Sequence, residues 1–389
     1  MKKREYVYGN CLTDELEQLN DLQSQSLNLP LDVTKKWSQV FELECHRTVQ
    51  CQKELVGGLA YISDEQHFGG RPVSCACVSA VAVAPHFRGY GVGKYLMNSF
   101  VQELAESELA ISSLYPSSWA FYRNAGYELA GSRNIFKAPL SALPKGKKEH
   151  DVVPASVKEV SSLSSMWRKT CNFENGTLAR IHPFFQGEKY LPKDELQVYK
   201  AMKEDTCEGY LTFCLRKEKQ TITIDTICAV NDLAMSSLLG FLRRHDPIYP
   251  EIAWCGAPLD GMAWFFAERH FKLVHHLPWM TRILQVSKAL TQRGYPKGFS
   301  GEFHFYIADS LVSQNEGTWK LVVEGGRASV ERGGKGNIKL DVAALVPLYT
   351  GSLSPRTLAL KKRLQATYEQ IEALSELFAG KSPYLSQMF

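Results

Sequence analysis

A strand gives way to a helix within the segment Val81-Ala82-Val83-Ala84-Pro85-His86-Phe87-Arg88-Gly89-Tyr90-Gly91-Val92-Gly93-Lys94. The first residues of this segment are apolar, and the chain then passes through three alternate glycines. A helix is expected from about Gly91, because Leu96, Phe100 and Leu104 recur along one face at the helical period. Glycine lets a backbone approach a ligand closely, and the first amides of a helix lack intrahelical partners. The segment therefore predicts a site for phosphate oxygens.

Three phosphate-binding motifs compete for these glycines. A nucleotide P-loop would need glycine and then Ser or Thr at the positions where this chain has Arg88 and Tyr95. A dinucleotide fingerprint would need glycine at the position of Lys94. The pattern that remains is R-x-x-G-x-G, formed by Arg88, Gly91 and Gly93. A purely structural glycine turn is the alternative interpretation.

A second informative segment lies further downstream and reads Ser113-Leu114-Tyr115-Pro116-Ser117-Ser118-Trp119-Ala120-Phe121-Tyr122-Arg123-Asn124-Ala125-Gly126-Tyr127-Glu128. Its simplest interpretation is a helix that packs Phe121 and Tyr122 into a core, followed by a turn at Gly126 that leads into a strand.

Together the two segments resemble the GNAT superfamily of N-acetyltransferases, which shares both R-x-x-G-x-G after a strand and the pattern F-Y-x-x-x-G-[YF]. The resemblance implies that acetyl-CoA is the co-substrate and that Tyr122 is the general acid for the departing thiolate, with a core aromatic as the alternative role. It also implies that the coenzyme is held by Val81, Val83, Arg88, Gly89, Gly91, Gly93, Lys94 and Ser117. Within that set, the backbone of Val81 and Val83 would contact the pantetheine arm, and the Val83 amide would face the thioester oxygen.

The run Y-P-S-x-x-x-F-Y-R-x-x-G-Y-E, which begins at Tyr115, is similar to the enhanced intracellular survival (Eis) branch of that superfamily. This resemblance implies a mixed α/β (α+β) chain of three domains. They are a catalytic GNAT domain at 1–150, a degenerate GNAT-like domain at 151–286 and a domain like sterol carrier proteins at 287–389. It further implies that the terminal carboxylate of Phe389 enters the active site. There the resemblance makes it the candidate for the base or base relay. A carboxylate with a pKa of about 3.5 is a poor base for an ammonium group unless burial raises its pKa or water relays the proton, so we expect it mainly to orient and attract the amine.

The middle domain departs from the coenzyme motif. After its comparable strand the chain reads Asn231-Asp232-Leu233-Ala234-Met235, with neither the arginine nor the paired glycines. We expect this domain to bind no coenzyme. Likewise, the sterol-carrier resemblance implies a fold and not lipid binding.

Composition excludes several other classes. A net charge of +4 over 389 residues is too weak to indicate a nucleic-acid partner, and no apolar run is long enough to span a membrane. The ten cysteines are scattered without a C-x-x-C pair, so we expect no metal site and no disulfide framework, only reduced cysteines in a cytoplasmic protein.

The resemblance therefore implies an acetyl-CoA-dependent N-acetyltransferase that acts on a primary amine, with an aminoglycoside or a polyamine-like small molecule as the first choice of acceptor. The alternatives are a peptide or protein lysine acetyltransferase, a non-catalytic acyl-CoA-binding regulator, and a lipid carrier acting through the third domain. The family resemblance also suggests a homo-oligomer, with a hexamer as the particular expectation.

Several local expectations concern secondary structure. Residues 54–62 and 73–83 are expected to be strands, 139–155 a linker rich in proline and lysine, 262–270 a helix, and 279–286 a strand.

Overall fold

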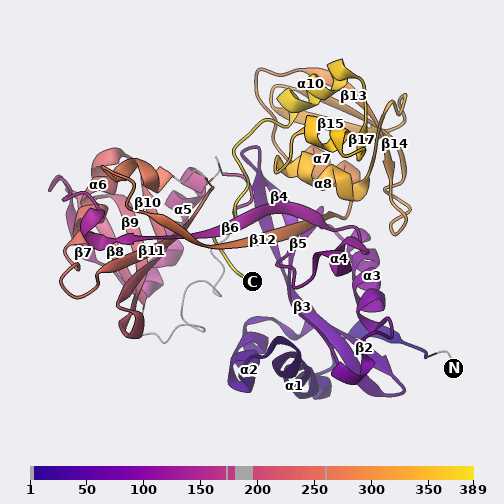
Figure 1. The fold of residues 1–389 in the computed structure, drawn as a ribbon, viewed down its shortest axis with the longest axis horizontal. Coiled ribbons are helices and arrows are strands. Elements are labelled where there is room, and N and C mark those ends of the chain that lie inside the picture. The colour runs from indigo at the N-terminus through magenta and orange to yellow at the C-terminus, as the bar shows by residue number, and fades with distance from the viewer. Residues whose placement is uncertain (1–3, 172–173, 180–195, 259–260) are drawn as a thin grey trace. The chain divides into compact units, whose positions relative to one another are not determined.

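The computed structural model describes residues 4–171, 174–179, 196–258 and 261–389 (Figure 1). The chain forms two compact units, each described here by itself. The first unit consists of Met1–Gly131, Pro278–Lys381 and Phe389, and the second of Ser132–Leu277 and Ser382–Met388. Segments far apart in the sequence therefore build the first unit. The domain boundaries expected at 150/151 and 286/287 stay predictions.

The larger sheet of the first unit has the strand order β1-β2-β3-β4-β5-β12. Neighbouring strands are antiparallel except β4 and β5, which are parallel. Strand β12 contributes residues 278–283 to this unit and pairs with β5 through its last four residues. The bounds are β1 Val7–Asn10, β2 His46–Cys51, β3 Glu54–Phe68, β4 Arg71–Val83, β5 Ile111–Leu114 and β12 Lys272–Ile283.

Helices cover both faces of this sheet. Leu55 packs in one buried cluster with Leu19 of α1, whereas the next residue, Val56, packs in another cluster with Leu96 of α3. Because successive side chains of a strand point to opposite faces, α1 and α3 lie on opposite sides of β3. The helices of this part of the unit are α1 Leu16–Leu27, α2 Leu31–Val40, α3 Val92–Ala105 and α4 Trp119–Arg123.

A second, five-stranded sheet completes the first unit, with the order β15-β14-β13-β16-β17. Its strands are β13 Gly301–Ala308, β14 Gly317–Glu324, β15 Arg327–Arg332, β16 Ile338–Asp341 and β17 Leu364–Gln365. The accompanying helices are α7 Val286–Gln292, α8 Val342–Thr350, α9 Pro355–Leu360 and α10 Tyr368–Leu377.

The two parts of the first unit meet in close contacts. Gly69, at the turn between β3 and β4, lies so near Gly294 that a Cβ on Gly69 would come within 2.0 Å of the Gly294 carbonyl oxygen. Next to it, the rings of Phe68 and Tyr349 lie 5.3 Å apart, and the guanidinium of buried Arg293 donates to the Tyr349 carbonyl at 2.7 Å. These contacts explain why residues 1–131 and 278–381 form one compact body.

The second unit has the strand order β6-β11-β10-β9-β8-β7, with residues 132–139 of β6 (Glu128–Pro139) belonging to it. Strands β10 and β11 are parallel. The other elements are β7 Asp151–Pro154, α5 Val160–Cys171, β8 Leu196–Lys203, β9 Thr206–Arg216, β10 Thr221–Ala229, α6 Asp232–Arg243 and β11 Glu251–Gly256.

The mixed α/β class is confirmed, and both early strands are present but extend further than expected, to Phe68 in β3 and from Arg71 in β4. The linker expected at 139–155 is wrong in part, because its apolar side chains join the core: Leu140 and Leu143 are fully buried. The same stretch also contains strand β7.

The helix expected at 262–270 is wrong as well. A short 3₁₀ helix covers Gly261–Phe265 instead. The strand expected at 279–286 also has other bounds, because β12 runs from Lys272 to Ile283 and Val286 begins helix α7. Met262 and Phe266 are buried four residues apart, and Phe271 packs against Phe266. The short 3₁₀ helix is therefore enough to bury both side chains, whose spacing of four residues had suggested a longer α-helix.

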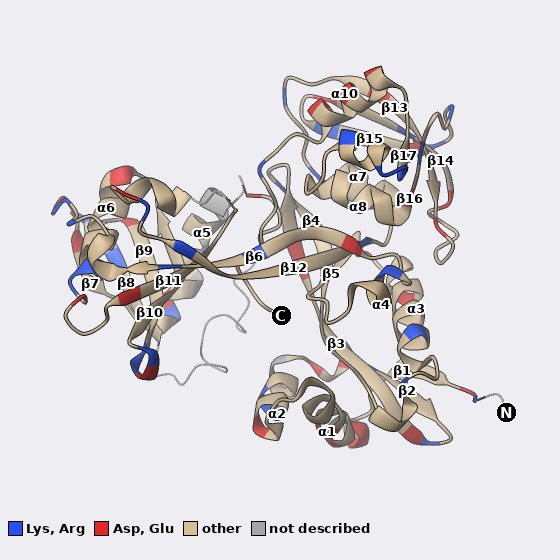
Figure 2. Ribbon diagram, in the orientation of Figure 1, with Lys and Arg blue, Asp and Glu red and all other residues tan. Residues whose placement is uncertain are grey.

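Lysine and arginine residues alternate with aspartate and glutamate residues along the elements of each unit (Figure 2). Among the described residues, none of the helices is both long enough and apolar enough to cross a membrane. The same residues contain no group of three or more His, Cys, Asp or Glu side chains placed to hold a metal ion. No disulfide joins the nine cysteines whose side chains the structure describes.

Candidate active site

The site expected from the sequence begins where β4 ends. β4 pairs with β5 only from Cys75 to Val78, although β4 continues to Val83. On its other side, the β3 pairing shifts register near Ala80, which has a φ of 53°. The two parallel strands therefore stop pairing just before the residues that were expected to contact the pantetheine arm.

The direction of the Val83 amide follows from the strand geometry. The Ala84 amide donates to the Val56 carbonyl on β3 at 2.9 Å. Because successive amides of a strand point to opposite sides, the Val83 N–H points away from β3, toward the β5 side. Helix α1 approaches the same backbone, where the Ser26 hydroxyl donates to the Val83 carbonyl at 3.2 Å.

The glycine-rich loop then places the start of α3 beside this strand end. Gly89 and Gly91 have φ values of 81° and 88°, which favour glycine, and a Cβ on either would meet no atom within 4 Å. Gly91 is the N-cap of α3 and offers no capping side chain. The amides of Val92 and Gly93 therefore have neither an intrahelical acceptor nor a cap from residue 91. Arg88 and Lys94 are exposed on either side of this helix start.

Gly93 serves a packing role that the sequence did not indicate. A Cβ at this position would lie 2.8 Å from Cε2 of Phe121. The glycine therefore allows helix α4 to approach the first turn of α3, and it links the two motif segments directly. A ligand-approach role was expected for all three glycines; at Gly93 the open side of the residue is filled by Phe121.

Two residues near the N-terminus also hold the loop, and sequence reasoning missed them. The Tyr6 hydroxyl donates to the Tyr90 carbonyl at 2.9 Å, and the Arg4 guanidinium lies 3.8 Å from the centre of the Tyr90 ring. Nothing in the local pattern around Arg4 and Tyr6 distinguishes them from ordinary surface residues, so no sequence signal identifies them.

Tyr122 is buried in α4, with a side chain only 4% exposed. Burial raises the pKa of the phenol to about 12, and a hydrogen bond with the Ser117 side chain partly opposes the rise. The phenol is therefore neutral at any physiological pH. Ser117, expected to touch the coenzyme, is exposed and meets the Tyr122 hydroxyl.

Phe389 belongs to the same unit as these residues. Its side chain is buried, and its ring lies 5.4 Å from the ring of Tyr115, the residue that follows β5 and precedes Ser117 by two positions. The packing brings the last residue of the sequence to the segment that carries Tyr122. All the expected site residues thus lie in the first unit.

The corresponding helix start in the second unit is different. Asn231 is the N-cap of α6, and its side-chain oxygen accepts from the Ala234 amide at 2.9 Å. Its amide nitrogen donates to Glu208 at 2.7 Å, which places a carboxylate beside the cap. A side chain thus occupies the position that a phosphate would need, and a negative charge lies next to it.

Family models match three parts of the sequence. A GNAT acetyltransferase domain matches residues 10–130, a second GNAT acetyltransferase domain matches residues 176–283, and a sterol carrier protein domain matches residues 286–386. No curated protein matches the chain. By its domain content the protein is a GNAT-type acyltransferase with two domains of that fold and one sterol-carrier domain.

Solved structures extend this assignment over the whole length. A GCN5-related N-acetyltransferase from Anabaena variabilis is 29% identical, with a TM-score of 0.95 over 99% of this chain and 100% of that one. A second such enzyme, from Kribbella flavida, is 22% identical with a TM-score of 0.88 over 99% of each chain. Eis1 from Mycobacterium abscessus is 20% identical with a TM-score of 0.80, over 99% of this chain and 100% of that one. The Eis-like identification is thereby confirmed at the level of domain content and fold.

Proposed function

We propose that this protein transfers the acetyl group of acetyl-CoA to a primary amine at the site in its first unit. The observation that carries the proposal is the uncapped start of α3, next to the end of β4, where Gly89 and Gly91 leave the loop open. Backbone amides at a helix start attract phosphate oxygens, and the helix dipole reinforces the attraction. Arg88 and Lys94 add positive charge at the same place.

The outward-pointing Val83 amide supports the next step. When an amine nitrogen attacks the thioester carbon, the carbonyl oxygen becomes an oxyanion that needs a hydrogen-bond donor. One backbone donor aimed at such an oxygen accelerates a reaction by roughly 10²–10³-fold. In the proposed complex the Val83 amide is that donor, because it faces away from β3 in the part of β4 that lies beyond Val78, the last β4 residue paired with β5.

Collapse of the intermediate breaks the carbon–sulfur bond and leaves a thiolate, and in this proposal Tyr122 is its partner. A full proton transfer from a phenol with a pKa of about 12 to a thiolate with a pKa of about 8.5 costs roughly 5 kcal/mol. We therefore assign Tyr122 primarily the role of a hydrogen-bond donor to the developing thiolate. Solvent then supplies the proton once the coenzyme is released.

The ammonium group must lose one proton to water before its nitrogen can attack, and a second proton leaves to water once the carbon–nitrogen bond has formed. In this proposal the Phe389 carboxylate orients the ammonium group before these losses. The buried ring of Phe389 against Tyr115 supports the assignment, because it fixes the residue next to the Tyr122 segment. The acceptor that we favour is an aminoglycoside or a polyamine-like amine, and peptide lysine is the alternative.

A thiol-release assay with acetyl-CoA and a panel of amines tests the proposal. The panel contains an aminoglycoside, spermidine and a lysine peptide, and a reaction without any amine is the blank. We expect amine-dependent thiol release with at least one of them and a mass increase of one acetyl group on that amine. Binding of acetyl-CoA without thiol release in the presence of any amine would favour a non-catalytic acyl-CoA-binding regulator. The absence of acetyl-CoA binding would contradict the proposed coenzyme site.

A matched pair of glycine variants locates the coenzyme in the first unit. Gly91→Ala strains a backbone with a φ of 88° at the proposed phosphate site, and we expect weaker acetyl-CoA binding. Gly240→Ala in helix α6 of the second unit is the control. It crowds Gly146, also in the second unit, and we expect lower stability without a change in coenzyme affinity. The expected hexamer can be measured on the same samples by light scattering.

A further inference from the structure

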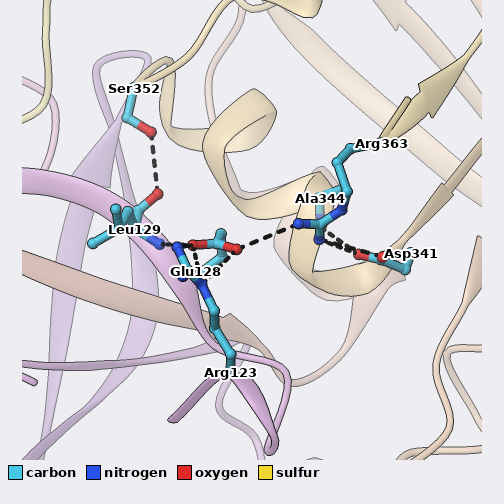
Figure 3. A network of polar contacts seen from close by, with 7 residues as sticks. All are labelled: Arg123, Glu128, Leu129, Asp341, Ala344, Ser352 and Arg363. Atoms are coloured by element: carbon cyan, nitrogen blue, oxygen red, sulfur yellow. Dashed lines mark hydrogen bonds and ion pairs between the residues drawn. The ribbon is translucent and has the colours of Figure 1, made fainter. Parts of the chain in front are cut away.

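The turn that follows Tyr122 is closed by an ion pair. Arg123 is the last residue of α4, and its Nε lies 3.0 and 3.1 Å from the two carboxylate oxygens of Glu128, with Nη2 at 2.7 Å from one of them (Figure 3). The Glu128 carboxylate also accepts from the Leu129 amide at 3.0 Å. Two parallel N–H donors on one carboxylate define its orientation as well as its position.

Glu128 has a second cationic partner, and it comes from the sterol-carrier part of the unit. Arg363 places Nη1 3.6 Å from the Glu128 carboxylate, and its Nη2 donates to Asp341 at 3.0 Å (Figure 3). Asp341 in turn caps helix α8 by accepting from the Ala344 amide at 2.6 Å. The Glu128 side chain is only 10% exposed, so its charge depends on these two arginines for compensation.

A second side chain, that of Arg282, packs against the same turn. Gly126 has a φ of 81°, and a Cβ on it would lie 2.8 Å from Nε of Arg282. Arg282 forms a fully buried ion pair with Asp309 at 2.6 Å. Asp309 and Arg363 both lie in the segment 286–386 that matches the sterol carrier protein domain. That segment therefore supports the turn at two separate points.

The position of Tyr122 depends on this turn. Helix α4 has only five residues, and a helix of that length does not hold its conformation by itself. The Tyr122 carbonyl accepts from the Tyr127 amide at 3.2 Å, and the two rings lie 6.0 Å apart. The residues that fix positions 123–128 therefore also fix where the phenol can point.

We propose that Arg363 and Glu128 are positioning residues for Tyr122, so that the sterol-carrier segment takes part in catalysis by holding the turn behind the phenol. This inference rests on the proposed acetyl transfer and deepens it. The sterol-carrier segment, residues 286–386, would then contribute to the reaction without binding a lipid.

The test uses the full-length protein and the substitution Arg363→Met, made both in the natural sequence and in Tyr122→Phe. Arg363→Lys keeps the charge and serves as the conservative variant, and Glu128→Gln removes the charge from the other side. Lys320→Met is the matched control, because Lys320 pairs with Glu302 at 3.2 Å and with Glu331 at 3.5 Å inside the five-stranded sheet. The measurements are kcat, KM for the amine, and the Kd of acetyl-CoA.

A displacement of a catalytic group by about 1 Å can cost up to roughly 100-fold in rate, so we expect Arg363→Met to lower kcat by about tenfold. The Kd of acetyl-CoA stays unchanged, Arg363→Lys recovers most of the rate, and Lys320→Met has no effect. In the Tyr122→Phe background Arg363→Met changes kcat by less than about twofold, because contacting residues that act through one group are not additive.

An equal loss of kcat in both backgrounds, or no loss in either, would overturn the inference. If Arg363→Met does not fold, the same comparison of kcat in the two backgrounds is made with Glu128→Gln. The outcome is distinct from a failure of the proposed function, which would show as no amine-dependent thiol release by the natural sequence.

Discussion

Replacing Tyr122 by Phe removes one hydroxyl from a buried ring and leaves the packing of α4 in place. Burial raises the pKa of this phenol to about 12, so its proton is present at every pH at which the enzyme can be assayed. A hydrogen bond to a charged partner contributes about 1.5–3 kcal/mol. Loss of that bond to a developing thiolate corresponds to a decrease in kcat of roughly 10- to 150-fold.

The pH dependence of kcat tests the same role of Tyr122 more stringently. A group acts as a donor while it is protonated, and its contribution is lost as the pH rises through its pKa. With the pKa of Tyr122 raised from 10.0 to about 12, the ratio of kcat between natural protein and Tyr122→Phe stays constant from pH 7 to pH 10. The measurement is a thiol-release rate at saturating acetyl-CoA at each pH.

Tyr295→Phe is the matched control, because the Tyr295 hydroxyl is also buried and donates to the Leu290 carbonyl at 2.7 Å. It lowers the free energy of unfolding by about 1 kcal/mol and leaves kcat unchanged. The reasoning is refuted if kcat does not fall in Tyr122→Phe. It is also refuted if the ratio narrows between pH 7 and pH 10, since that would show the phenol ionising in this range.

Three further predictions concern packing, the buried ion pair and the tail. Gly93→Ala forces its new methyl group against Phe121, so we expect a loss of about 1–3 kcal/mol in stability together with weaker acetyl-CoA binding, measured by thermal unfolding and calorimetry. Unchanged stability would show that α4 moves away freely. Asp309→Ala leaves Arg282 buried without a counter-charge, and we expect a loss of about 3–5 kcal/mol in the free energy of unfolding by denaturant. A loss below about 1 kcal/mol would mean that the guanidinium finds water. Two glycines added after Phe389 are expected to lower kcat/KM for the amine while leaving the Kd of acetyl-CoA unchanged; an unaltered kcat/KM would remove the carboxylate from the proposal.

The sequence was most informative where one local pattern has one physical cause. The strand, the glycine turn and the helix around Gly91 could be predicted because alternation, positive φ and helical periodicity all act within a few residues. For the same reason the absence of paired glycines after β10 was visible in the sequence, and the structure adds that Asn231 fills the helix start.

Contacts between distant segments were not predictable in this way. Arg363 and Glu128 lie far apart in the chain, and each looks like an ordinary surface charge in its own neighbourhood. Gly126 suggested a turn, but the presence of Arg282 beneath it depends on β12 lying next to β5. An α-helix was predicted where the chain forms a short 3₁₀ helix, Gly261–Phe265, because two buried residues four positions apart are compatible with either structure.

The close approach of Gly69 to Gly294 has a consequence for how the protein is made. During synthesis on the ribosome, residues 1–131 emerge long before residues 278–381, yet the two segments belong to one compact unit. Until the later segment arrives, the edge of β5 has no β12 beside it and Phe68 has no Tyr349 to cover it. An open strand edge next to an uncovered aromatic ring is prone to mispairing with other chains. The first segment therefore completes its packing only after residues 278–381 have been synthesised and have folded against it.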